Sequence, residues 1–375
     1  MLLSMVCWGS WANTQKADSR WRFELFYLDY NIGLLACAIL VGLTLGNLHP
    51  SSPDSFVANL RSASPASLLE AIAGGIVFTA GNLLLVAAIS IAGMAVAFPV
   101  GSGLGLVLGA ILNYLVAPSG NPILIFSGIA LVCAAIALDA LAFRAHSRIA
   151  IPTPIPPPPN LSSRPEASPR EAAAERPATF PPTHHPEKLS SRPEASPSEA
   201  VAERPATPTP STAKGLILSV FGGIGAGLFY PFVAKSLTGP GHLNPYTVNF
   251  VFCLGAAISA IPIAWVFMRK PVTGPQLSFK DYFAGRAFLH AWGLLGGLIW
   301  GVGTIANFVA SYVPMIGPAT SFSMGEGNTM ISALWGVFVW REFRGATPAT
   351  RILLTLMFLS FLLGLTSIAL APIVH

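Results

Sequence analysis

Charged residues are scarce in this chain of 375 residues: Asp, Glu, Lys and Arg make up 10% of it. A soluble domain has about 25%, so this composition excludes an ordinary water-soluble protein. Cysteine is also rare, and none of the four residues has the CxxC or Cys/His spacing of a zinc or redox site. We therefore expect no metal and no cofactor. The cysteines, which we interpret as buried packing thiols, are Cys7, Cys37, Cys133 and Cys253.

Familiar enzyme signatures are missing as well. Neither HExxH nor GxSxG occurs in the sequence, and an intramembrane hydrolase would need such a constellation. We therefore expect that the protein is not an enzyme. The net charge of +5 does not indicate a nucleic-acid partner, because most basic residues lie in short loops beside apolar runs, where they report membrane topology.

Long apolar runs dominate what is present. About 20 mostly apolar residues cross a bilayer core of roughly 30 Å as a helix, and ten runs fit this description. They are residues 1–14, 26–46, 67–90, 93–117, 121–144, 214–236, 245–268, 287–312, 316–340 and 350–372. The sequence predicts an all-α polytopic membrane protein with ten transmembrane helices. The first run would span only about 20 Å, so we expect the given start to lie inside that helix.

One long polar segment divides the chain into a first half, 1–145, and a second half, 214–375. Residues 146–213 are rich in Pro, Ser, Ala, Glu and Arg, a composition that cannot build a packed core. Within it, residues 161–179 recur at 189–207 with 17 of 19 positions identical. We interpret the segment as a disordered linker that contains a tandem duplication.

The two halves resemble each other. Glycines of the third and fourth runs match glycines of the eighth and ninth runs at an offset of 222: Gly74-Gly75 with Gly296-Gly297, Gly81 with Gly303, Gly103 with Gly325, and Gly105 with Gly327. At a different offset, Tyr30 matches Tyr246 and Cys37 matches Cys253. Because five helices are an odd number, the halves are predicted to be inverted repeats, with a substrate site near the bilayer midplane between them.

Basic residues set the expected orientation. They concentrate in loops on one side of the predicted helices, whereas the other side has only Arg61 and Lys235. We expect the protein to lie in the cytoplasmic (inner) membrane. The positive-inside rule then places the linker in the cytoplasm and both termini outside.

Several short motifs resemble the ureide permease family. They are Cys7-Trp8-Gly9-Ser10-Trp11, Phe26-Tyr27-Leu28-Asp29-Tyr30, Ala73-Gly74-Gly75-Ile76-Val77 with Gly81-Asn82, Leu334-Trp335-Gly336-Val337, and Arg341-Glu342-Phe343-Arg344. The resemblance covers both halves and omits the linker. It implies the drug/metabolite transporter fold, with ten helices in two inverted five-helix repeats. It also implies proton-coupled uptake of allantoin-like ureides, oxo-purines or pyrimidines.

Two features depart from that family. Plant ureide permeases carry a nucleotide-binding-like motif in the central loop, and this linker has no GxxxxGK[ST]. Glu326 stands where the resemblance leads us to expect a neutral residue. Related glucose/ribose porters and rhamnose-proton symporters share the architecture, so a sugar porter is the alternative substrate class. A non-transporting membrane sensor or scaffold is the further alternative. The sequence leaves open whether the protein forms a homodimer.

Polar and aromatic residues at membrane depth are the candidates for substrate binding. Asn82, Asn307 and Asn328 could offer amide groups to a neutral solute. An interhelical hydrogen bond is the plainer interpretation of each one alone, whereas the three together favour a polar cavity. Trp11 and Tyr30 could contact the solute or simply anchor the helices at the interface. Trp300 lies in mid-helix, where its indole could stack on a planar ring. We expect Asp29, near a helix end, to be interfacial.

Glu326 is the candidate proton-coupling residue. It lies about ten residues into the ninth predicted helix and has a glycine on each side. Placing an ionised carboxylate at the bilayer centre costs about 2.5–3.5 kcal/mol on insertion scales, so such a group should accept a proton, pair with a cation or face a wet cavity. A structural hydrogen bond to another helix is the plainer interpretation.

Overall fold

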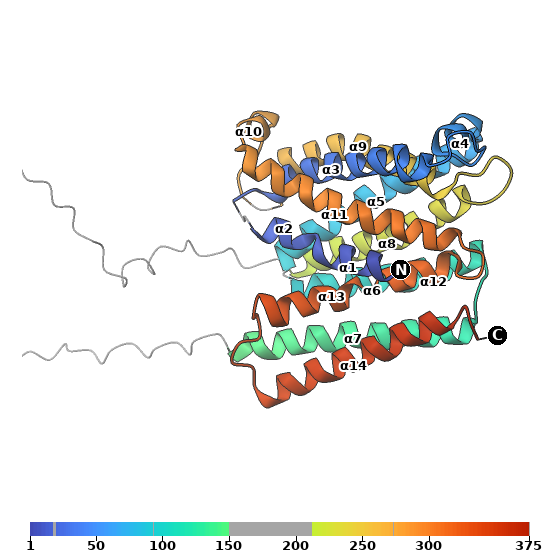
Figure 1. The fold of residues 1–375 in the computed structure, drawn as a ribbon. Coiled ribbons are helices and arrows are strands. Elements are labelled where there is room, and N and C mark those ends of the chain that lie inside the picture. Colours follow the sequence, from blue (N-terminus) through green and yellow to red (C-terminus); the bar gives the residue numbers. More distant parts are fainter. Residues whose placement is uncertain (18–19, 93, 150–211, 273, 375) are drawn as a thin grey trace, which may run out of the picture. The chain divides into compact units, whose positions relative to one another are not determined.

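The computed structural model describes residues 1–17, 20–92, 94–149, 212–272 and 274–374, and the regular structure of these residues is helical (Figure 1). A helix satisfies its backbone hydrogen bonds within one segment, which an apolar solvent requires. Nearly all of the predicted linker, with its duplication and its expected disorder, lies outside the described residues. The polytopic, all-helical architecture expected from the sequence is confirmed.

Eight of the ten predicted runs form single long helices. They are α3 (Phe23–Leu43), α5 (Pro65–Ala92), α6 (Met94–Val116), α7 (Pro122–Ile149), α8 (Thr212–Ser236), α9 (Pro245–Arg269), α11 (Ala287–Tyr312) and α14 (Pro348–Leu370). Among the described residues, seven helices are long and apolar enough to cross a membrane, and α6 contributes a shorter apolar helix, Val100–Val116. Proline begins several of these helices, where its missing N–H has no helical partner to lose.

The other two predicted helices are interrupted. The first divides into α1 (Leu2–Ser10) and α2 (Ala12–Ala17), with Trp11 between them. The ninth divides into α12 (Gly317–Gly325), α13 (Asn328–Leu334) and the π-helical turn η3 (Trp335–Val339). Our expectation of one continuous helix over 316–340 is therefore wrong. Glycines beside Glu326 weaken the helix, and Gly327 packs closely on Met5 and Leu365.

Short elements close the ends of the long helices. The turn η1 (Leu45–Asn47) and α4 (Phe56–Ser62) lie at one end, and α10 (Phe279–Phe283) lies at the opposite end, which also carries α2 (Figure 1). Asn244 starts α9 by accepting from the N–H groups of Tyr246 and Thr247, a side-chain cap for donors that the helix leaves free. We refer to the end that carries α2 and α10 as the basic end.

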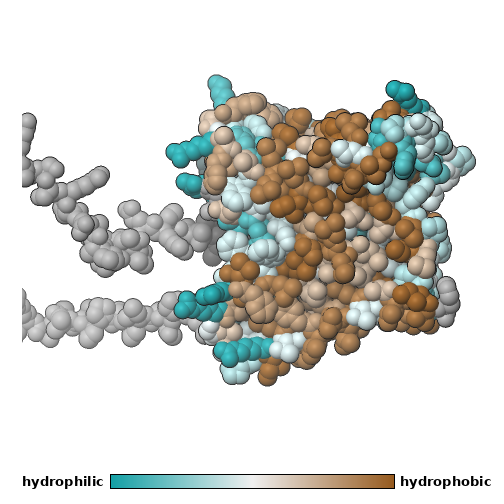
Figure 2. All heavy atoms as spheres, viewed as in Figure 1, coloured by the Kyte–Doolittle hydropathy of each residue, from teal (hydrophilic) through white to brown (hydrophobic). Residues whose placement is uncertain are grey.

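The helices of the two halves interleave rather than forming separate bundles. α3 packs on α11 and α9, α5 packs on α8 and α9, and α1 packs on α11 and α13, whereas α7 and α14 pair beside them. Two clusters of buried apolar side chains fill the interior. Large apolar side chains also cover the outside, such as Leu40, Ile258 and Leu363, each about 60% exposed. Figure 2 shows a broad apolar band on one face with hydrophilic residues at both ends, as expected for contact with lipid.

Glycines provide the closest helix contacts. Gly33 of α3 lies against the backbone of Leu294 in α11, and Gly297 of α11 lies against the carbonyl of Tyr30 in α3. A side chain at either position would overlap backbone atoms, which cannot move aside without separating the helices. Small residues are the usual means of helix association in membranes, because lipid provides no hydrophobic force between apolar helices.

We expect Gly297→Ala to destabilise the protein by about 1–3 kcal/mol, the usual cost of overpacking. The matched control is Gly103→Ala in α6, where an added methyl would meet no atom within 4 Å and where Ala improves helix propensity by about 0.5–1 kcal/mol. Thermal unfolding of the full-length protein in detergent measures both. Equal melting temperatures for the two variants would contradict the close α3–α11 contact.

Candidate functional site

Five aromatic rings meet in the interior, and we refer to Trp8, Trp11, Tyr27, Tyr30 and Trp300 as the aromatic cluster. Trp8 stacks on Trp300 with ring centroids 5.3 Å apart and an interplanar angle of 14°. Tyr30 lies 4.9 Å from Trp11, 5.4 Å from Tyr27 and 6.3 Å from Trp300, between ring centroids. The cluster joins α1 and α3 of the first half to α11 of the second.

Glycines of α11 allow the rings to approach one another. Gly303 faces Trp8 and Cys7 of α1, and Gly297 faces the backbone of Tyr30. Trp300 lies between these two glycines along α11. The same close packing that holds the helices together therefore brings the indoles and phenols into contact.

Polar atoms lie among these rings. Tyr30 is fully buried, and its hydroxyl has no hydrogen-bond partner among the described residues. The neighbouring Tyr27 hydroxyl accepts from Asn82 Nδ2 at 3.2 Å, and Trp8 Nε1 donates to Thr304 Oγ1 at 3.2 Å. A buried hydroxyl without a partner costs about 1–3 kcal/mol. The Tyr30 hydroxyl is therefore a donor and acceptor that a polar ligand could satisfy.

Most of the predicted substrate residues lie in or beside this cluster. Trp11, Tyr30 and Trp300 belong to it, and Asn82 reaches it through Tyr27. Trp8 covers one face of Trp300, the ring for which the sequence suggested stacking on a solute.

Asn307 borders the cluster, because a side chain on Gly325 would meet both Trp8 and the Asn307 amide. It is engaged in contacts between helices: its side-chain carbonyl accepts from the Tyr230 hydroxyl, and its amide donates to the Ser321 carbonyl at 2.9 Å. Ser321 in turn donates to the Asn307 backbone carbonyl at 2.8 Å. These bonds tie α8, α11 and α12 together.

The break in the ninth helix lies next to the cluster. Glu326 ends α12, and Asn328 begins α13 after one tight turn. Thr329 donates to the Glu326 backbone carbonyl at 3.1 Å, while no described residue hydrogen-bonds to the Glu326 carboxylate. The carbonyl of Asn328 lies against Gly9 of α1. A broken helix leaves polar backbone free, and in membranes such backbone occurs where it lines a cavity or contacts other protein.

Asp29 is buried inside the protein, and its expected place at the membrane interface stays a prediction. Its carboxylate is 2% exposed and accepts from Trp21 Nε1 at 3.0 Å, from the Tyr282 hydroxyl at 2.6 Å and from His290 Nδ1 at 2.8 Å. Tyr282 and His290 come from α10 and the start of α11, in the second half of the chain. The carboxylate therefore joins the two halves at the basic end.

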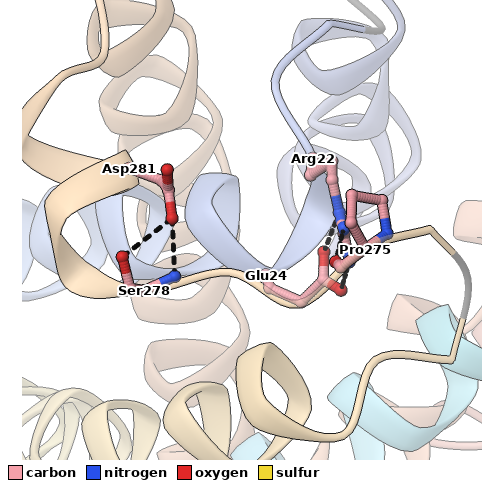
Figure 3. A network of polar contacts seen from close by, with 5 residues as sticks. All are labelled: Arg22, Glu24, Pro275, Ser278 and Asp281. Atoms are coloured by element: carbon pink, nitrogen blue, oxygen red, sulfur yellow. Dashed lines mark hydrogen bonds and ion pairs between the residues drawn. The ribbon is translucent and has the colours of Figure 1, made fainter.

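A second polar network lies at the same end. Figure 3 shows Arg22 paired with the buried Glu24 while its guanidinium also donates to the carbonyl of Pro275 at 2.5 Å. Nearby, Ser278 and Asp281 bond to each other and form the cap of α10. The loop after α9 is thus attached to the start of α3.

Hydrogen bonds also join the halves at the opposite end. Asn59 of α4 donates to the carbonyl of His242 at 3.1 Å, and its own side-chain carbonyl accepts from the Asn244 N–H at 2.9 Å. Asn244 also donates to the carbonyl of Asp54 at 2.7 Å. The aromatic cluster therefore lies between two sets of contacts that link the halves.

Sequence reasoning missed Trp8, Tyr27 and Asp29 as parts of this arrangement. All three lie inside short motifs that carry the family resemblance, 7–11 and 26–30. Their place inside these motifs could have identified them as candidates. Their contacts could not be predicted, because the partners Thr304, Trp300 and His290 lie far away in the sequence.

Two tyrosines allow a matched test of this arrangement. Tyr30→Phe removes a hydroxyl that has no partner among the described residues, so it should leave the free energy of unfolding unchanged or raise it. Tyr230→Phe removes the partner of Asn307 and should cost about 1 kcal/mol or more. Thermal unfolding in detergent is the measurement. A larger loss for Tyr30→Phe than for Tyr230→Phe would show that the Tyr30 hydroxyl has a structural partner.

The sequence is similar to those of known membrane proteins. A sequence model of ureide permeases matches residues 26–150 and 207–371. Ureide permease 2 of Arabidopsis thaliana is 27% identical over 96% of this chain and 93% of its own length. Probable ureide permease A3 of Vigna unguiculata is 26% identical over 94% of this chain and 96% of its own length. Transmembrane protein 144 homolog B of Dictyostelium discoideum is 31% identical over 44% of this chain and 42% of its own length. The chain belongs to the ureide permease family.

Proposed function

We propose that this protein is a proton-coupled secondary transporter that takes up a small neutral polar metabolite, of the ureide, oxo-purine or pyrimidine class, through the site around the aromatic cluster. The observation that carries the proposal is the buried hydroxyl of Tyr30, which has no partner in the described part of the chain and lies among aromatic rings of both halves. A ureide or pyrimidine is planar and has N–H and C=O groups at its edge. It could stack on indoles while bonding to Tyr30 and Asn82.

The names of the relatives support this substrate class over a sugar. Several full-length relatives are ureide permeases. Sugars also present hydroxyls on both faces, whereas the cluster presents mainly ring faces and a few polar atoms at their edges. We assign substrate contacts to Trp11, Tyr30, Asn82, Trp300, Asn307 and Asn328.

Helix contacts support inverted repeats. Gly33 of α3 packs on Leu294 of α11, and the residues displaced by 222 positions, Gly255 of α9 and Ile72 of α5, also lie in contact. Likewise, Gly297 packs on the Tyr30 carbonyl, and Gly75 packs on the Phe252 carbonyl. The offset of 222 thus extends to α3 and α9, which argues against the match of Tyr30 with Tyr246.

The packing of whole helices follows the same relation between the halves. α1 packs on α11 and α13, and the equivalent α8 packs on α5 and α6. Two halves related in this way can rock about a site between them and expose it alternately to each side. In this scheme a shift of α1 would uncover the face of Trp300 that Trp8 covers. With the positive-inside orientation, the basic end would face the cytoplasm.

Glu326 is our choice for proton coupling. It lies at the break between α12 and α13, where Gly325 touches Trp8 and Gly327 touches Met5, so it adjoins the aromatic cluster. No described residue bonds to its carboxylate, in contrast to Asp29 and Glu24. A carboxyl group without a fixed partner can accept and release a proton as the halves move.

Uptake by cells tests the substrate class. In a bacterial host without its own carriers for these compounds, we expect the protein to accumulate radiolabelled allantoin, uracil or hypoxanthine several-fold over empty cells. Glucose and rhamnose serve as matched controls and should show no increase. Accumulation of a sugar alone would overturn the substrate assignment and leave the fold unaffected.

Substitution of Glu326 tests the coupling. Glu326→Gln keeps the size and hydrogen bonding of the side chain but cannot carry a proton, so accumulation driven by an imposed pH gradient should fall at least tenfold while exchange of labelled for unlabelled substrate persists. The control is Glu342→Gln, because Glu342 pairs with Lys16 near the surface. If the Glu326→Gln variant accumulated substrate as well as wild type in proteoliposomes, the coupling role would be wrong.

A further inference from the structure

A basic cleft lies at the basic end, between the end of the interrupted ninth helix and α14. Its volume is about 300 Å³. Its wall combines three arginines, Arg341, Arg344 and Arg351, with apolar side chains of Val337, Phe343 and Leu354. A cavity with both kinds of lining suits a ligand that has an anionic part and an apolar part.

The three arginines have no acidic partner among the described residues. The only carboxylate between positions 335 and 354 belongs to Glu342, and it is paired with Lys16 of α2. Lys16 also lies over the Trp340 ring, 4.6 Å from its centroid. Three arginines therefore line one cleft, and in the described part of the chain none of them forms an ion pair with a carboxylate.

The backbone around the cleft is held in an unusual form. Arg341 has a φ of 52°, and it is the one non-glycine residue with positive φ in the described part of the chain. Gly345 also has positive φ, at 80°, and the side chain of Thr347 caps the first turn of α14 by accepting from the Thr350 N–H at 3.2 Å. A strained backbone at a non-glycine position is typical of ligand clamps and other functional sites.

The surroundings place the cleft at the boundary between lipid and water. Phe338, Val339 and Ile352 are about 57–66% exposed beside it, which suits contact with lipid tails. Trp340 adjoins them, and tryptophan is typical of the membrane interface. Arginine side chains at the end of a membrane helix reach the headgroup level.

We propose that this cleft is a binding site for an anionic phospholipid. The phosphate binds Arg341, Arg344 and Arg351, and one acyl chain lies along Val337, Phe343 and Leu354. Arginine suits a phosphate because its planar guanidinium donates two parallel hydrogen bonds, and basic pockets between membrane helices are known to hold lipid headgroups. The bound lipid links η3 to α14 and so steadies the end of the interrupted helix. This assignment does not depend on the transported substrate.

Lipid binding to the purified full-length protein tests the proposal. After delipidation in detergent, the wild type is titrated with short-chain phosphatidylglycerol, phosphatidylcholine or inorganic phosphate, and bound lipid is counted by native mass spectrometry. We expect phosphatidylglycerol to bind at least tenfold more tightly than phosphatidylcholine. The triple variant Arg341→Gln, Arg344→Gln, Arg351→Gln should lose this preference.

A matched control removes three cations from the same end but outside the cleft. The variant Lys270→Gln, Lys280→Gln, Arg286→Gln should keep the preference, since these residues are exposed and do not line the cleft. An equal loss in the control would overturn the site in favour of diffuse surface charge. Displacement of the lipid by millimolar inorganic phosphate would indicate a soluble anion instead. Should the triple variant not fold, the Arg351→Gln variant alone decides, and unchanged lipid binding there would refute the proposal.

Discussion

Direct backbone contact at glycines is the constraint on which the rest of this structure depends. Lipid is as apolar as the helices, so burial of apolar surface does not hold them together as it would in water. What remains is close van der Waals packing and a few hydrogen bonds. Gly33, Gly75, Gly255 and Gly297 each face the backbone of a neighbouring helix, and each of these contacts joins the first half of the chain to the second. At these four positions the halves therefore meet backbone to backbone, and the large side chains of the aromatic cluster pack beside them.

Such contacts determine what can lie between the halves. Because α3 and α11 approach at Gly33 and Gly297, the large side chains next to these glycines are directed to the same region, and Tyr30 and Trp300 become neighbours. Small residues along a contact also permit sliding, since no side chain must leave a pocket. Hydrogen bonds at the two ends, through Asp29 and through Asn244, instead fix the position of one half against the other. A rocking motion would have to open one of these sets while preserving the glycine contacts.

The sequence predicted most of the fold because apolar length is a local property. Runs bounded by Pro65, Pro122, Pro245 and Pro348 begin within a few residues of their expected positions. The interruption after Gly325 was not predicted. The glycines beside Glu326 indicate only a weak point in a helix, and the packing of Gly327 on Met5 and Leu365, which accompanies the break, is a tertiary contact that the sequence does not reveal. The burial and the partners of Asp29 were not predicted, because its surroundings are also set by distant residues. Its place near a helix end suggests an interface, but its donors arrive from α10 and α11 through tertiary structure.

The acidic residues of the membrane helices differ in what they can do, and the difference follows from their partners. Glu24 is paired with Arg22, and Asp29 accepts from three donors. A carboxylate held in this way is compensated by fixed donors where it is. Such residues are suited to holding helices together. Glu326 has no bonded partner among the described residues and lies at a helix break beside the aromatic cluster. With no bonded partner in the described part of the chain, its charge is left for a proton, water, a cation or a ligand to balance, which is the property that the proposed coupling role requires.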